Sequence, residues 1–326
     1  MKRLILCCDS AWDPPRGGHT NVLGLARAIA SEDEDGVTQV VYYQDRALSV
    51  ETEEPQPLGR DIRGAYRFLV HNYADGDEIW LFGSSRGATI ARCCIGLLRN
   101  VWLLDRRQAH RIDEAYRIYR TRWRADAANA VAFRQAHCRQ VSVRFLGVWD
   151  TVGDGGVPGK AEGENVDAGF HDNRLSGIVE HGYHALAIDE RRKTRAPVLW
   201  RTHPERTRTE QCWFAGNHQD IGGGHAEDGL SRITLAWMAD KAAAAGLAFD
   251  RDFLDTLTRE TREKVVHGSG REQLRRAGFT RRIIGCLNGD EILHTSAEQR
   301  FLRDNRYRPG NLAEFLARDE QIQLPL

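Results

Sequence analysis

Apolar residues follow two different spacings along the first hundred residues of the chain. Two continuous apolar runs, at 4–8 and 79–82, have the length and residue types of buried strands, and the β-branched and aromatic residues of 38–43 predict another strand. Three further segments place apolar side chains at helical spacing, at 22–29, 62–73 and 90–98. Asn21 is the expected N-cap of the first of these helices. This alternation predicts an α/β fold with a doubly wound, mostly parallel sheet.

Beyond residue 100 the pattern is less regular. Residues 106–136 interrupt it with many arginines and one apolar stripe, made of Ile112, Ala115, Tyr116, Tyr119 and Trp123. Such a stripe predicts a helical insertion or cap. Further strands are predicted at 141–149, 197–200 and 210–215, and helices at 183–192 and 230–244. Residues 247–326 predict a C-terminal helical extension, and the absence of repeats and linkers favours one domain over 1–326.

Composition narrows the classes of function. The 46 basic and 46 acidic residues cancel, so no overall field favours nucleic acid or an anionic membrane. The seven cysteines form no C-x-x-C pair, and two adjacent pairs lie in apolar runs, which indicates buried thiols in a reducing compartment. No signal peptide and no membrane-spanning stretch is recognised, so we expect a cytoplasmic protein, or one exported by a specialised system. No cofactor is predicted.

The most informative motif is Gly-x-Ser-x-Gly at Gly83–Gly87. It follows an apolar strand and precedes a helix, which is the layout of a nucleophile elbow with Ser85 at its apex. Gly83 and Gly87 suit that turn because strand and helix must approach closely. Ser85 would lie at the helix N-terminus, where backbone N–H groups favour developing negative charge.

Two further residues complete a candidate catalytic set. A serine nucleophile needs a base within hydrogen-bond reach and a group that orients that base. Asp150 directly follows a predicted strand, and His218 lies just beyond another, in the chain order Ser, Asp, His. Asp220 is the alternative acid. We expect the oxyanion to be bound by the N–H of Arg86 and by an N–H of the loop after the first strand, where Ser10 or Ala11 donates and Asp9 fixes the loop.

Each of these residues also has a simpler interpretation. Asp9 and Asp150 are residue types that commonly stabilise turns. His218 could instead be a structural histidine, or a metal ligand together with Asp220 and His225. The metal hypothesis would make hydrolysis metal-dependent.

Taken together, several segments resemble the α/β-hydrolase domain of type VI secretion phospholipase effectors, which also occurs in bacterial and fungal proteins of unassigned function. The resemblance extends from the first strand to about Leu312. It rests on Cys8–Trp12, Thr20–Val22, Leu81–Ala88, Gly147–Val152, His184–Arg191 and Gly216–Gly224.

The resemblance implies that Ser85 is the nucleophile, Asp150 the acid and His218 the base, and that the reaction is hydrolysis of a carboxylic ester. For the effector members the substrates are acyl esters of glycerophospholipids, with peripheral membrane contact. The chain departs from the family at Asp9–Ala11, where Asp-Gly-Thr is usual, and at Gln44–Ala47, which replaces a glycine-rich turn. A small-ester carboxylesterase or lipase, and a catalytically idle binding or toxin-accessory module, are therefore alternative hypotheses.

Overall fold

The computed structural model describes residues 1–9, 19–44, 58–121, 126–153, 174–201, 208–259, 264–268, 274–276, 278–285 and 291–318. Its centre is a seven-stranded sheet in the order β2-β1-β3-β6-β7-β8-β9. The strands are β1 Arg3–Cys8, β2 Gln39–Gln44, β3 Glu78–Ser84, β6 Val143–Trp149, β7 Val179–Ala187, β8 Arg208–Phe214 and β9 Glu291–Leu293. Every neighbouring pair in this sheet is parallel, so the predicted α/β class is confirmed.

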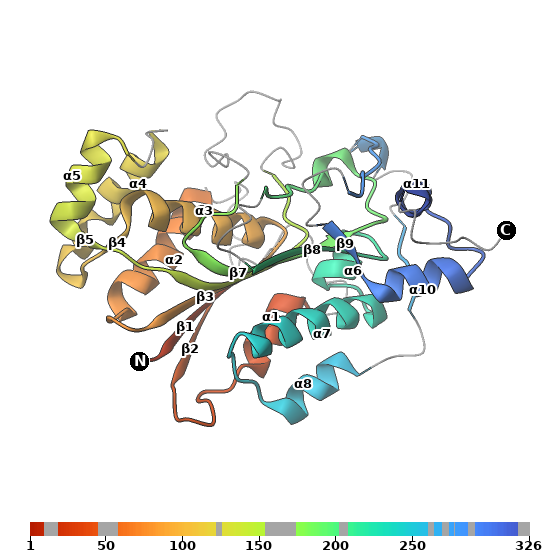
Figure 1. Ribbon diagram of the computed structural model, residues 1–326, viewed down its shortest axis with the longest axis horizontal. Helices are drawn as coiled ribbons and strands as arrows, with labels where there is room; N and C mark the ends of the chain where they lie inside the picture. The colour runs from red at the N-terminus through yellow and green to blue at the C-terminus, as the bar shows by residue number, and fades with distance from the viewer. Residues whose placement is uncertain are drawn as a thin grey trace.

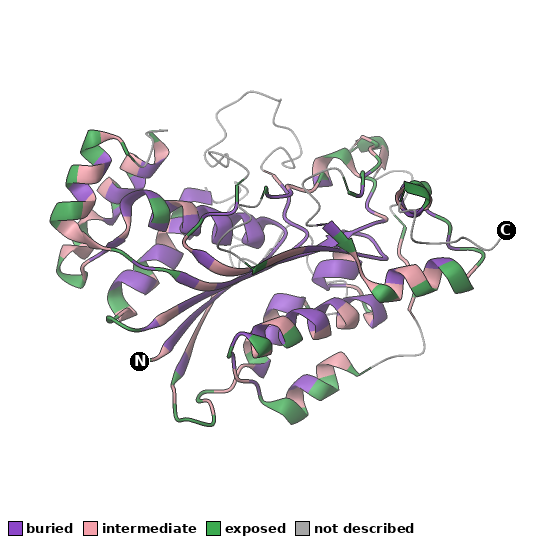
Figure 2. Cartoon of the chain, viewed as in Figure 1, coloured by how far each residue is buried: buried purple, intermediate pink, exposed green. Residues whose placement is uncertain are grey.

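Helices cover both faces of the sheet (Figure 1). Side chains of β1 alternate between the two layers, because successive residues of a strand point to opposite faces: Leu4 and Leu6 pack in one cluster, Ile5 and Cys7 in the other. One layer contains α2 Leu58–Asn72, α3 Arg86–Val101, α4 Ile112–Arg120 and α5 Ala128–His137. The opposite layer contains α1 Asn21–Ala28, α7 Gly229–Ala244 and α8 Arg251–Thr258. The sheet between them is largely buried (Figure 2).

The strand order places a topological switch beside β1. The chain passes from β1 to β2 on one side and then returns to β3 on the other. In open α/β sheets the carboxyl ends of the strands on either side of such a reversal form the usual ligand-binding crevice. Ser85 follows β3 directly at this edge, and Asp150 follows the neighbouring β6.

Two predictions beyond residue 180 were wrong. Residues 183–192 were expected to be helical, but residues 183–187 belong to β7, which is hydrogen-bonded between β6 and β8, and residues 188–192 form no helix. The alanines and leucine of this strand favour a helix locally, and pairing on both edges overrides that preference. Residues 197–200 form no strand. The N–H and carbonyl of Trp200 bond instead to the Gln211 side chain, each at 2.9 Å.

The N-cap of α1 is Thr20 rather than the predicted Asn21. The Thr20 hydroxyl accepts from the N–H of Leu23 at 3.1 Å. The side chain of Asn21 is buried and donates to the carbonyls of Ile221 and Ser231, both at 2.9 Å. Asn21 therefore holds α1 against the segment that follows β8.

The predicted insertion forms η2 Arg106–Arg111, α4 and α5, next to a small antiparallel pair made by β4 Leu103–Leu104 and β5 Cys138–Arg139. Ile112, Ala115, Tyr116 and Tyr119 are buried in the same cluster as α3, whereas Trp123 lies outside the described residues. The C-terminal segment is not solely helical. It supplies β9 to the sheet besides α8, α10 Thr295–Arg303 and α11 Gly310–Arg318.

Candidate active site

Ser85 occupies a strained turn between β3 and α3. Its φ of 54° and ψ of −117° lie in a region that side chains with a Cβ rarely adopt. Its N–H donates to the carbonyl of Trp149 at 2.9 Å, which ties the turn to the end of β6. A Cβ on Gly87 would lie 1.9 Å from the carbonyl oxygen of Cys8, and one on Gly83 would lie 2.5 Å from that of Gly87. The two glycines thus permit the close approach of strand and helix.

Asp150 and His218 meet at this edge from different strands. Asp150 follows β6, is fully buried and has a φ of 43°. His218 begins α6 (His218–Gly222), a short helix after β8 whose N-cap is Asn217. The Nδ1 of His218 lies 2.6 Å from the Oδ2 of Asp150, so the carboxylate accepts from Nδ1 and leaves Nε2 as the acceptor of the neutral ring.

Arg282 is a site residue that sequence analysis missed. Its Nη1 lies 2.5 Å from Oδ1 of Asp150 and its Nη2 lies 2.9 Å from Oδ2, so both carboxylate oxygens are held. Burial alone would raise the pKa of Asp150. The charge of Arg282 and the hydrogen bonds from His218 and Arg282 outweigh it, and hold the pKa well below its usual range. Asp150 therefore stays ionised.

A second missed arginine contacts the nucleophile itself. The Nη1 of Arg195 lies 3.1 Å from Oγ of Ser85 and 3.4 Å from Nε2 of His218. Among the described contacts of Ser85 and His218 there is no direct hydrogen bond between the two side chains. Burial and the charge of Arg195 lower the pKa of His218, although the hydrogen bond to Asp150 partly opposes them. His218 is consequently neutral at pH 7.

The carboxylate of Glu190 adds a further support. Its Oε2 accepts from the backbone N–H of His218 at 3.3 Å, and the same carboxylate is paired with Arg192. Burial raises the pKa of Glu190, but Arg192 and His218 together lower it to about 2. Sequence analysis could not single out Arg192, Arg195 or Arg282, because arginine supplies nearly all the basic residues of the chain.

Among the other predicted site residues, Arg86 and Asp9 lie at this edge of the sheet. Arg86 is the first residue of α3, so its N–H is at the helix N-terminus beside Ser85. Asp9 follows β1, and its Oδ2 accepts from the hydroxyls of Tyr43 (2.7 Å) and Thr20. Ser10 and Ala11 lie outside the described residues.

Asp220, the alternative acid, does not bind the imidazole of His218. Its Oδ2 accepts from the N–H of Asn217 at 2.8 Å, and its Oδ1 lies 2.5 Å from Nδ1 of His267. The structure therefore does not bring His218, Asp220 and His225 together as the expected group of metal ligands. Asp220 and His225 group with His267, while His218 belongs with Asp150.

A parallel sheet that presents a serine on a strained strand–helix turn, next to an Asp–His pair, defines an α/β-hydrolase-like protein. Residues 2–241 match the family model described as T6SS, Phospholipase effector Tle1-like, catalytic domain, and the chain belongs to this family. Membership in a family of phospholipase effectors supports ester hydrolysis as the activity of the domain. No described helix is long and apolar enough to cross a membrane.

The individual proteins that this chain resembles share low sequence identity with it. An uncharacterized protein of Saccharomyces cerevisiae, YEL023C, is 29% identical over 225 residues, which cover 59% of this chain and 31% of the yeast protein. The crystal structure of an uncharacterized protein from Pseudomonas aeruginosa has a TM-score of 0.42 at 15% identity, covering 80% of this chain and 48% of that one. The structure of the Tle1 effector bound to the VgrG spike of the type 6 secretion system has a TM-score of 0.39 at 16% identity, with coverages of 69% and 51%. The chain thus spans 31% of the yeast relative and about half of each solved structure.

Proposed function

We propose that the protein is a serine hydrolase that cleaves carboxylic esters through an acyl-enzyme, with acyl esters of phospholipids as its substrates. The observation that carries the proposal is the convergence of Ser85, His218 and Asp150 at one edge of the sheet. Ser85 projects from a strained turn, and the ionised Asp150 holds His218 in the tautomer whose Nε2 accepts a proton.

In the proposed reaction, Oγ of Ser85 attacks the ester carbonyl and Nε2 of His218 takes the hydroxyl proton. Asp150 stabilises the resulting imidazolium. The backbone N–H of Arg86, with an N–H from the Ser10–Ala11 loop, stabilises the oxyanion. His218 then returns the proton to the leaving alcohol, and afterwards activates the water that releases the acid. Catalytic hydrogen bonds commonly shorten only when substrate is bound. The proposal therefore does not require Ser85 and His218 to be directly hydrogen-bonded in the structure without substrate.

Arg195 supports an anionic ester as substrate. Its guanidinium is buried and lies within hydrogen-bond distance of Oγ of Ser85. Arginine binds phosphate oxygens through paired N–H donors. In the proposed complex Arg195 moves from Ser85 and His218 onto the phosphate of the lipid, and the two catalytic side chains then meet. A neutral small ester offers no such group, so the small-ester hypothesis predicts no role for Arg195 in substrate binding.

The first test is the intact mass of the protein after treatment with a fluorophosphonate. We expect one adduct on the wild-type chain and none on Ser85→Ala, with the adduct on Ser85 in a peptide map. Turnover of phospholipid should fall by at least about a thousandfold in Ser85→Ala. A wild-type chain that gains no adduct and hydrolyses no ester would support the idle binding or toxin-accessory module instead.

The second test separates the substrate classes. Initial rates are compared for short soluble esters and for mixed vesicles of phosphatidylglycerol and phosphatidylcholine, in wild type and Arg195→Met. We expect the variant to lose much more activity on the phospholipids than on the short esters. Equal losses on both would argue against phosphate recognition and leave the carboxylesterase hypothesis.

A further inference from the structure

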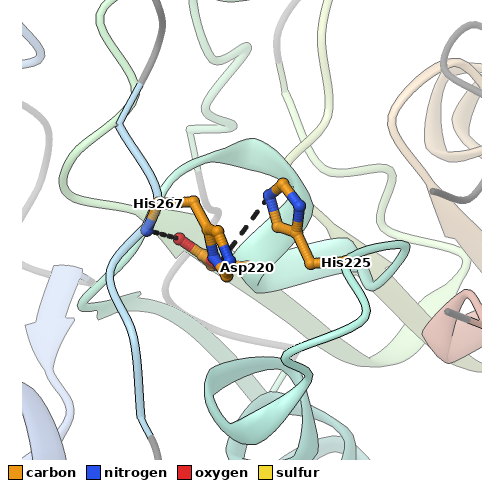
Figure 3. A group of neighbouring side chains, drawn as sticks. All are labelled: Asp220, His225 and His267. Carbon is orange, nitrogen blue, oxygen red and sulfur yellow. Dashed lines mark hydrogen bonds and ion pairs between the residues drawn. The ribbon is translucent and has the colours of Figure 1, made fainter. Parts of the chain in front are cut away.

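Beside α6 lies a cluster of ionisable side chains that the proposed reaction does not use. We propose that Asp220, His225 and His267 form a binding site for one divalent transition-metal ion of the zinc type (Figure 3). The three side chains come from α6, from the turn after it and from the segment 264–268.

The ligand atoms are close enough to share one ion. Oδ1 of Asp220 lies 2.5 Å from Nδ1 of His267 and 3.9 Å from Nε2 of His225. One ligand atom from each residue lies within 4.8 Å of the others. Zinc bound at about 2.0–2.1 Å places neighbouring ligands of a tetrahedral site roughly 3.3 Å apart. The imidazole rings of His225 and His267 stack with centroids 3.8 Å apart, so one ring turns out of this stack when both nitrogens bind the ion.

The carboxylate of Asp220 is oriented by the backbone. Its Oδ2 accepts from the N–H of Asn217 at 2.8 Å and from the N–H of His267 at 3.0 Å. These two bonds direct Oδ1 toward the imidazoles. Fixing a metal-binding carboxylate through its second oxygen is a common feature of metal sites.

His267 has the outer partner expected of a metal-bound histidine. Its Nε2 lies 3.4 Å from Oε2 of Glu227, while Nδ1 faces Asp220. When Nδ1 binds the ion, Nε2–H donates to Glu227. This is the carboxylate–histidine–metal arrangement that sets the tautomer and raises the basicity of the ligand nitrogen.

The backbone around the cluster explains why distant residues meet there. Gly223 and Gly224 have φ values of 83° and 116°, and turn the chain so that His225 returns over α6. The carbonyl of His267 accepts from Nδ2 of Asn217 at 2.9 Å, which anchors the segment 264–268 beside α6. A bound ion would therefore connect the C-terminal part of the chain to the helix that carries His218.

The donor set indicates the type of metal. Two imidazole nitrogens and one carboxylate oxygen suit Zn²⁺, Co²⁺ or Ni²⁺ better than Mg²⁺ or Ca²⁺, which prefer oxygen ligands. Asp220 is almost fully buried, whereas the His225 and His267 side chains are 15% and 20% exposed, so an ion reaches the site from solvent. The three ligands do not include Ser85, His218 or Asp150, so the ion is not expected to take part in ester hydrolysis.

The test uses the untagged full chain, treated with chelator and dialysed, with Zn²⁺ as titrant in calorimetry and Co²⁺ as spectroscopic probe. We expect one Zn²⁺ per chain, a higher melting temperature with Zn²⁺, and visible Co²⁺ absorption bands. His225→Ala and His267→Ala should weaken Zn²⁺ binding by more than about tenfold. The exposed His110, on η2, provides the matched control, because His110→Ala should bind Zn²⁺ as wild type does.

A wild-type chain that binds no Zn²⁺, or whose affinity survives both histidine changes, would overturn the proposal. Glu227→Gln keeps all three ligands, so it tests the site even where the alanine variants fold poorly. It should lower Zn²⁺ affinity without changing the stoichiometry, and an unchanged affinity would contradict the assigned role of Glu227. None of these measurements depends on turnover, so they stand apart from the test of Ser85.

Discussion

Arg282 and Asp150 form a bidentate ion pair in the interior of the protein, with both side chains almost completely buried. The same guanidinium donates to the carbonyls of Ala187 and Arg195, at 2.9 and 2.6 Å. One side chain from the C-terminal part of the chain thereby connects the end of β6, the end of β7 and the segment that carries Arg195.

This pair leads to a prediction about stability. Arg282→Met leaves a buried carboxylate without its counter-ion, which costs about 3–5 kcal/mol in comparable cases. We expect a loss of that order in the free energy of unfolding, measured with urea. Adding Asp150→Asn to Arg282→Met should recover part of it. The neighbouring Arg281 is the control: its pair with Glu314 is exposed, so Arg281→Met should change the stability by less than about 1 kcal/mol.

The turn at Ser85 makes a second prediction. A residue with a Cβ at φ 54° is strained, by about 1–3 kcal/mol in comparable sites, and glycine relieves that strain. Ser85→Gly should therefore unfold at higher urea than Ser85→Ala, although both lack the hydroxyl and should be inactive. If the alanine variant proves equally stable or more stable, the backbone at this position is not strained as described.

Close packing at Gly87 leads to a third prediction. A Cβ there would lie 1.9 Å from the carbonyl oxygen of Cys8, and both atoms belong to rigid backbone. We expect Gly87→Ala to lower the free energy of unfolding by at least about 3 kcal/mol, or to prevent folding. Gly177→Ala, where a Cβ meets no atom within 4 Å, should stay near wild type. Similar stability of the two variants would show that β1 and α3 are less tightly packed.

The pH dependence of hydrolysis follows from His218. Its folded pKa is lowered, so the neutral base is present at pH 7 and activity is lost only as the pH falls through a value below about 6.5. Because the unfolded chain binds that proton more readily, the protein should also lose stability as the pH falls below about 6.5. Both trends are measurable from pH 4 to 8.

Arg195 contributes to this lowered pKa, which gives a further prediction. Arg195→Met removes a positive charge 3.4 Å from Nε2 of His218, so the pKa should rise and the acid limb of kcat/KM should move to higher pH. Arg191→Met, on the exposed part of the same connection, should leave the limb in place. An unmoved limb in the Arg195 variant would mean that the arginine acts on substrate alone.

Much of the architecture could be predicted from the amino-acid sequence. Alternating strand and helix periods predicted the parallel sheet, because buried parallel strands need continuous apolar runs. The nucleophile elbow at Ser85 could also be predicted from the local sequence, because its turn depends on glycines two positions to either side. Asp150 and His218 could be placed at strand ends by counting, and carboxyl ends of parallel strands share one edge of the sheet.

The features that sequence analysis missed depend on contacts between segments far apart in the chain. β7 was mistaken for a helix because its alanines favour one, and only pairing with β6 and β8 reversed that preference. Arg195, Arg282 and His267 lie in segments without a motif, and among many arginines none is marked by its neighbours. Arg195 and Arg282 are placed by contacts with Ser85 and Asp150, more than a hundred residues away along the chain, and His267 is placed by its contacts with α6, because charge and hydrogen bonding are satisfied between segments that only the fold brings together.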